Sequence, residues 1–70
     1  MPHLFEITGY WKDDKTDLNG LVYEFDECPD HLKDEDIFFY GLSEENIKEL
    51  IEAGENSAYD FVITSYTKKS

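Results

Sequence analysis

Residues 42–54, LSEENIKELIEAG, have the strongest structural signal in the chain, that of one short amphipathic helix. Ser43 is a favourable N-cap, and the two glutamates that follow it suit the positive end of the helix dipole. Gly54 is typical of the position where a helix stops. The apolar residues would form a buried stripe of Ile47, Leu50 and Ile51, with Leu42 placed for a hydrophobic staple on Ile47. The segment therefore predicts a helix that buries a single face.

Outward from this helix, three segments alternate between apolar and polar side chains, as half-buried strands do. They are residues 3–11 and 21–26 before the helix and residues 58–66 after it. Asn19-Gly20 favours positive φ and predicts a hairpin turn between the first two strands. Residues 37–40, IFFY, are too short for the pattern to separate a strand from a helical turn.

The expected order is β-β-(β)-α-β in one compact acidic domain over residues 1–70, with 67–70 as a frayed tail. The predicted fold class is α+β: a small single-layer, antiparallel-type sheet of three or four strands with one helix packed on one face. The face under the helix would hold Phe5, Ile7, Tyr23, Phe25, Phe61 and Ile63. The other face, open to water or to a partner, would hold Glu6, Thr8, Tyr10, Val22, Glu24, Val62 and Thr64.

The charge of the chain is strongly one-sided. It holds 17 acidic residues against six lysines, has no arginine and carries a formal net charge of −11. Phosphate groups repel such a surface, so neither nucleic acid nor anionic membrane is expected to bind it directly. Five phenylalanines, five tyrosines and one tryptophan favour a folded core over disorder, and they leave tyrosines for a recognition surface.

The expected setting is the cytoplasm, or the host cytoplasm if the chain is viral. Cys28 is the single cysteine, so no disulfide can form within one chain. The first ten residues lack the basic and apolar regions of a signal peptide, and no apolar run is long enough to span a membrane.

Two metal-site patterns are incomplete. With Gly20 at its central glycine, an EF-hand-like loop would use Asp17, Asn19 and Asp26, but Lys15 stands where the first carboxylate belongs and strands are expected on both sides. Cys28 and His31 have a CxxH spacing, yet His3 is the only other histidine and structural zinc needs about four ligands. No metal or other cofactor is expected.

No catalytic constellation stands out either. A Cys28–His31 pair has no orienting third group in the sequence, and no glycine-rich phosphate loop is present. Close pairs of carboxylates are inevitable in so acidic a chain and do not by themselves indicate acid–base chemistry. The chain is therefore not expected to be an enzyme.

The acidic residues gather in two places, which form the candidate partner-binding site. One is the loop between residues 24 and 36, and the other is the exposed side of the helix, where three glutamates fall within about 60° of arc. The candidate residues are Asp26, Glu27, Asp30, Asp34, Glu35 and Asp36 in the loop and Glu45, Glu49 and Glu52 on the helix.

These carboxylates are candidates to replace phosphates on a basic protein surface. A net charge of −11 equals that on about 19 Å of duplex DNA. The predicted function is inhibition or modulation of a basic, nucleic-acid-binding host protein, with DNA mimicry as the mechanism. In size and charge the chain resembles small acidic bacteriophage proteins that block host nucleic-acid-binding or defence proteins, a resemblance of overall profile that assigns no role to any residue.

Two alternatives remain open at this point. The acidity can serve solubility alone, as solvated charged surfaces commonly do. The chain can also be a structural or assembly protein that forms a homodimer through an edge strand or the open sheet face. In that case the contact would be made by Tyr10, Val22, Val62 and Tyr66.

Overall fold

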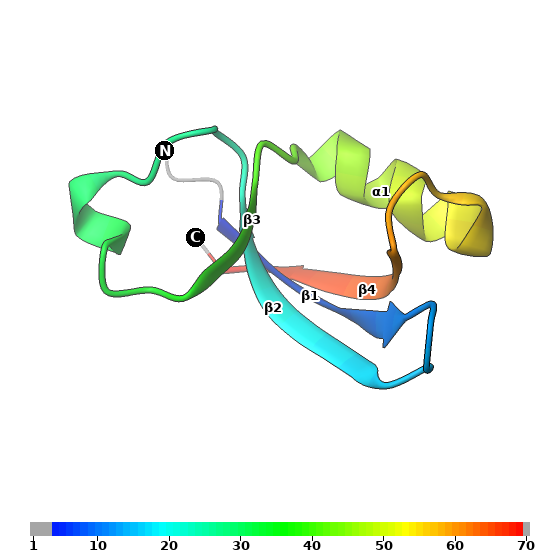
Figure 1. Cartoon of the computed structure of the whole chain (residues 1–70). Coiled ribbons are helices and arrows are strands. Elements are labelled where there is room, and N and C mark those ends of the chain that lie inside the picture. The colour runs from blue at the N-terminus through cyan, green and yellow to red at the C-terminus, as the bar shows by residue number, and fades with distance from the viewer. Residues whose placement is uncertain (1–3, 70) are drawn as a thin grey trace.

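The computed structural model describes residues 4–69, which form one α-helix and a four-stranded sheet (Figure 1). The elements are β1 (Leu4–Trp11), β2 (Asp17–Tyr23), the 3₁₀ turn η1 (Asp30–Leu32), β3 (Ile37–Tyr40), α1 (Glu44–Ala53), the 3₁₀ turn η2 (Gly54–Asn56) and β4 (Phe61–Lys68). The α+β fold class is confirmed, and residues 37–40 prove to be a strand.

The sheet is mixed rather than wholly antiparallel. Its strand order is β3-β2-β1-β4, and β1 pairs antiparallel with both of its neighbours, while β3 lies parallel to β2. A parallel connection needs a crossover of about a dozen residues or more. Residues 24–36 supply that crossover, so the segment expected to be an acidic loop is what allows β3 to join the sheet.

The hairpin turn lies earlier than predicted. The backbone N–H of Trp11 donates to Thr16 O, and Lys15, with φ of 61°, donates its N–H to Trp11 O, so residues 12–16 make the turn. Asn19 and Gly20 instead lie inside β2, opposite Thr8 and Ile7. The Asn-Gly prediction was wrong because this glycine meets a packing need: a Cβ on Gly20 would lie 2.8 Å from the Cβ of Phe38.

The core under α1 matches the prediction in β1 and β4 but not in β2. Phe5 pairs with Val22, and the alternation of the strand then places Val22, not Tyr23, on the helix side. A shift of one residue exchanges the two faces of a strand, which is why Tyr23 and Phe25 were assigned wrongly. The buried residues of this main core are Phe5, Ile7, Leu18, Val22, Leu42, Ile47, Phe61 and Ile63.

A second, smaller core lies on the opposite face of the sheet. Leu4 pairs with Tyr23, and both side chains pack with Leu32 of the crossover, each less than a tenth exposed. This end of the sheet is therefore covered, although the whole opposite face was expected to be open. Phe25 lies beyond the end of β2 and is 52% exposed, with its ring 5.5 Å from that of Tyr23.

The helix follows its local signals. Ser43 Oγ accepts the backbone N–H of Asn46, and Asn46 Oδ1 accepts the backbone N–H of Ser43, which completes a capping box. Leu42 and Ile47 are both buried, as the staple requires, and the helix ends at Ala53 before Gly54, whose φ is 58°. Substituting such an N-cap by alanine typically costs about 1 kcal/mol.

The last strand begins and ends later than predicted. It starts at Phe61 and reaches Lys68, which pairs with Phe5, and the N–H of Lys69 donates to Leu4 O at 2.7 Å. Residues 67–69 are therefore held by the sheet and are not frayed. Residue 3, where the first strand was expected to begin, and residue 70 lie outside the described range.

Gly9 marks the closest approach of β1 to β4. The pairing of the two strands shifts between Thr8 and Gly9, and a Cβ on Gly9 would lie 1.7 Å from Val62 O, a backbone atom. Because the strands are paired on both sides of this point, neither can move away without loss of hydrogen bonds. Only glycine fits here.

We therefore expect Gly9→Ala to lower the free energy of unfolding by about 3 kcal/mol. That is a large share of the roughly 4–10 kcal/mol available to a domain of this length. Urea denaturation followed by tryptophan fluorescence would measure the change. Thr67→Ala, at an exposed position of β4, is the control and should change stability little; equal effects of the two substitutions would contradict the close approach.

Candidate functional site

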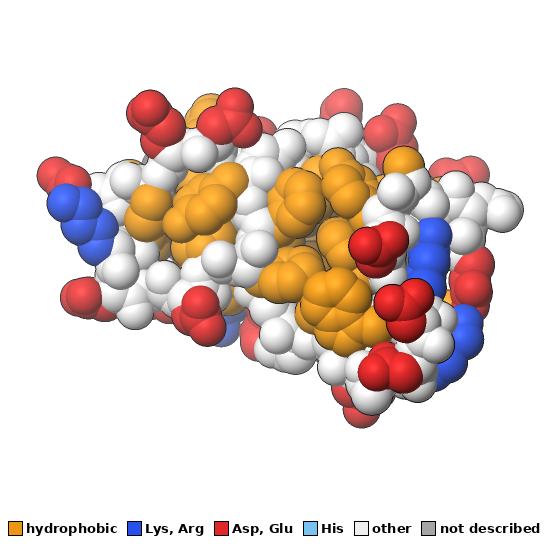
Figure 2. Space-filling view, in the orientation of Figure 1, with side chains coloured by type: hydrophobic (Ala, Val, Ile, Leu, Met, Phe, Trp, Pro, Cys, Tyr) orange, Lys and Arg blue, Asp and Glu red, His pale blue; other side chains and the backbone are white. Residues whose placement is uncertain are grey.

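All nine candidate carboxylates are exposed. Figure 2 shows acidic side chains along the upper edge and at both ends of the molecule, and lysine side chains mainly at the two ends. Within residues 4–69, Asp30 is the one member of the set in a salt bridge, to Lys33 at 3.1 Å, and the other eight have no charged partner. Their charge is therefore left for solvent or for another molecule.

The three helix carboxylates form a compact row. Glu45, Glu49 and Glu52 lie within about 60° of arc at 100° per residue, on the side of α1 away from buried Ile47. A rise of 1.5 Å per residue separates Glu45 from Glu52 by about 10 Å along the axis, or roughly one charge per 5 Å. One strand of DNA carries a charge per about 3.4 Å, so the row has a lower but comparable density.

The crossover carboxylates are split between two levels. The outgoing arm, residues 24–28, lies on the same side of the molecule as α1, whereas the returning arm, residues 33–36, lies at the level of the sheet (Figure 1). Asp34, Glu35 and Asp36 on the returning arm are thus separated from the helix row. The structure does not bring the nine predicted residues onto one face.

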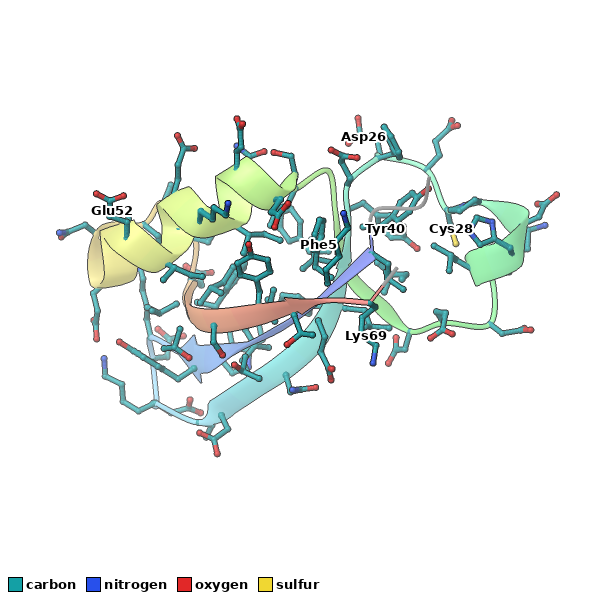
Figure 3. The ribbon with its side chains drawn as sticks, turned by 180° about the vertical axis from the view of Figure 1, so that it is seen from behind. Phe5, Asp26, Cys28, Tyr40, Glu52 and Lys69 are labelled. Atoms are coloured by element: carbon teal, nitrogen blue, oxygen red, sulfur yellow. The ribbon has the colours of Figure 1, made fainter. Side chains whose placement is uncertain are left out.

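Asp26 is the crossover residue that extends the helix row. A Cβ on Gly41 would lie 2.6 Å from Asp26 Oδ1, so this carboxylate sits against the turn that leads into α1. Figure 3 shows Asp26 and Glu52 on the same side of the molecule, near the two ends of a line along the helix. We call Asp26, Glu45, Glu49 and Glu52 the acidic ridge.

Lysines neutralise acids elsewhere but not on the ridge. Lys15 Nζ bonds Glu55 at 2.7 Å, and Lys69 lies 3.7 Å from Glu6. Lys12 Nζ donates to Ser57 O. Lys48 lies on α1 but forms no ion pair within residues 4–69. The distribution of lysines therefore leaves the ridge with a net negative field.

Glu55 shows what a carboxylate engaged in the fold looks like. Lys15 Nζ and the Tyr10 hydroxyl both donate to Glu55 Oε2, at 2.7 and 2.9 Å, which ties η2 to the β1–β2 hairpin. The bond from Lys15, followed by that from Tyr10, lowers the pKa of Glu55 below its ordinary value. The same bond to Glu55 raises the pKa of Tyr10.

A groove of about 390 Å³ runs beside the ridge, between α1 and the chain that leads into β4. Its lining includes Leu42, Leu50, Ala53 and Tyr59, and its polar side chains are Asn46, Glu49, Asn56 and Ser57. Glu49 thus belongs to both the ridge and the groove. This groove could not be predicted from the sequence, because only the tertiary structure places Tyr59 opposite the helix; the excess of tyrosines was the one available signal.

The incomplete metal patterns gain no support from the fold. Asp17 and Asn19 lie in strand β2, so residues 15–26 do not form a loop of the EF-hand kind. Cys28 is exposed, and its Sγ lies 3.6 Å from Pro29 O. Across residues 4–69, no three His, Cys, Asp or Glu side chains are grouped to hold a metal ion.

The four residues expected to make a homomeric contact do not form one exposed surface. Val22 is 0% and Val62 3% exposed, and Tyr66 turns toward α1, where its hydroxyl donates to Glu44 Oε2 at 2.6 Å. The fourth residue, Tyr10, donates its hydroxyl hydrogen to Glu55 Oε2.

Comparisons of the chain with protein-family models, with curated proteins and with solved structures found no match. Within residues 4–69, no helix is long and apolar enough to cross a membrane.

Two single substitutions should separate the ridge from the carboxylates that support the fold. Glu49 has like charges three and four residues away and no partner among the described residues, so Glu49→Gln should raise Tm by about 2 °C at pH 7 and low salt. Glu55→Gln should lower Tm. Thermal denaturation would measure both, and a loss of stability in Glu49→Gln would show that this carboxylate supports the fold.

The effect of Glu55→Gln should also depend on pH. The pKa of Glu55 is lowered in the folded state, so its contribution is present above the unfolded pKa and disappears as the pH falls through the folded value. The variant and the wild-type protein should therefore differ in Tm at pH 7 and converge in strong acid.

Proposed function

We propose that the protein inhibits or modulates a basic, nucleic-acid-binding protein by presenting the acidic ridge to its phosphate-binding surface. The observation that supports this most is that no cationic group among residues 4–69 pairs with the ridge, although lysines pair with acids elsewhere. Unpaired like charges along one helix face destabilise it slightly. A binding role gives a reason for that cost, because the charges are then neutralised by a partner.

The dimensions of the molecule favour a match to one strand of a duplex. The longest dimension is 34 Å. Over that length each strand of DNA carries about 10 phosphates, and both strands together about 20. The net charge of −11 is close to the single-strand value. The proposed mimicry is therefore of one phosphate row facing a protein groove, and not of a whole duplex.

Charge reversal with a matched control tests this proposal. We expect Glu45→Lys/Glu49→Lys/Glu52→Lys to reduce capture of the partner about tenfold or more, since each reversal replaces an attraction by a repulsion. Asp13→Lys/Asp17→Lys/Asp60→Lys changes the net charge equally at exposed positions away from the ridge and should retain capture. This control excludes simple ion exchange.

The assay is a pull-down from nuclease-treated bacterial lysate with immobilised protein, elution by duplex DNA, and identification by mass spectrometry. The proposal expects a basic nucleic-acid-binding protein, released by DNA, from the wild-type and control proteins but not from the ridge variant. Equal recovery by both variants, or retention that duplex DNA does not compete away, would rule out the ridge as the binding surface.

A second candidate function is self-association through the outer edge of β3. This strand is at the end of the sheet order, so the outer side of its backbone is unpaired by any described strand, and its half-buried side chains are apolar or aromatic. Edge strands of this kind readily pair with another chain.

If β3 mediates assembly, the dimer should be favoured by salt, because screening reduces repulsion between two chains of like charge. Light scattering at several protein concentrations, in roughly 20 mM and 500 mM NaCl, would measure this. A monomer under all conditions would exclude this second function and leave the proposed partner binding unaffected.

A further inference from the structure

The groove beside the ridge combines apolar surface, neutral polar side chains and one carboxylate. Leu42, Leu50 and Ala53 supply aliphatic surface, and Tyr59 supplies an aromatic ring. Among the described residues that line it, Glu49 is the single charged one. Figure 2 shows apolar side chains gathered on the adjoining face of the molecule and bordered by acids. A ligand with a cationic group near Glu49 and apolar surface against Leu50 and Ala53 would match this groove, and Asn46, Asn56 and Ser57 offer it further polar contacts.

The ring of Tyr59 is held in place by its neighbours. It stacks on Phe61, with centroids 5.3 Å apart and an interplanar angle of 21°, and it meets Phe39 edge-on at 5.2 Å. Its hydroxyl has no hydrogen-bond partner within residues 4–69, nor does the Asn56 side chain. A rigid ring with free polar groups around it gives a ligand defined contacts at small entropic cost.

We infer that the groove binds an arginine side chain of the partner protein, together with an apolar residue next to it. The guanidinium would pair with the Glu49 carboxylate, whose planar fork it matches, and its stem would cover Leu50 and Ala53. Arginine also stacks on tyrosine more readily than lysine does. The inference rests on the proposed function, and it names the side chain by which the basic surface is recognised.

The size of the groove agrees with this occupant. A volume of about 390 Å³ lies at the lower end of the range for small-ligand sites, roughly 300–1,000 Å³. It suits one or two side chains and is too small for a folded element. The absence of any lining cation makes an acidic or phosphorylated ligand unfavourable, because it would meet Glu49 uncompensated.

An NMR titration with defined peptides tests the inference without the unknown partner. The probe is acetyl-Leu-Arg-Leu-amide, and the matched peptide carries citrulline, which has the shape of arginine without its charge. We expect the arginine peptide to shift the amides of groove residues such as Ala53, Ser57 and Tyr59 in a saturable way. The citrulline peptide should bind roughly fivefold more weakly, as expected for an exposed ion pair.

Two variants one helical turn apart test which carboxylate binds the arginine peptide. Glu49→Gln should weaken binding of the arginine peptide roughly fivefold, and Glu45→Gln, which removes the same charge outside the groove, by less than about twofold. Equal effects of the two variants, equal binding of the two peptides, shifts spread over all acidic segments, or no saturable binding would each overturn the inference.

The outcome is separable from that of the proposed function. If a Glu45→Lys/Glu52→Lys variant, which leaves Glu49 in place, still captured the partner while the peptides behaved as expected, the ridge proposal would fail and the groove inference would stand. If capture depended on the ridge but the peptides did not distinguish Glu49 from Glu45, the groove inference would fail alone.

Discussion

The rest of the structure depends on the register in which Leu4 pairs with Tyr23 and Phe5 with Val22. Adjacent residues of a strand point to opposite faces, so these two pairs send apolar side chains to both sides of the sheet. Phe5 and Val22 anchor the core under α1, and Leu4 and Tyr23 require a second cover. The crossover supplies it with Leu32, and in doing so it delivers β3 parallel to β2. If β1 and β2 paired one residue out of register, both cores would lose the residue pairs that anchor them.

Local rules were sufficient to predict the helix, and pairing rules were needed for the sheet. Ser43, the apolar stripe and Gly54 act within a few residues of one another, so the sequence alone located α1. In β2 the alternation can be followed through Leu18 and Val22 or through Tyr23 and Phe25, and only contact with β1 selects the first. The sequence of β3, which has only four residues, likewise does not show that this strand lies parallel to β2. The sequence predicted which segments are acidic and which face of the helix carries glutamates. It did not predict that the two arms of the crossover lie apart, because that depends on the path of the backbone.

Carboxylates in this protein fall into two groups with different physical roles. Glu44, Glu55 and Glu6 each contact a hydroxyl or an ammonium group of another segment and so connect elements of the fold. Within the part of the chain that the structure describes, the ridge carboxylates contact no hydroxyl or ammonium group, and Glu49 also lines the groove beside Tyr59. Glu49 therefore belongs both to the negatively charged ridge and to the groove beside it. The charge of the ridge can attract a basic surface from a distance, and the groove can distinguish between the side chains of that surface.

The pairing of the ends of the described chain has a consequence for biosynthesis. β1 is the second of the four positions from one edge of the sheet, yet its neighbour β4 is the last of the four strands to be made, and Lys69 bonds back to Leu4 across the described residues. On the ribosome, β1 can form its hairpin with β2 early, but its other edge stays unpaired until residues 61–68 emerge. Contacts of such long sequence separation slow folding. Until then the nascent chain carries an open strand edge, and the repulsion between its many negative charges helps to keep neighbouring nascent chains apart.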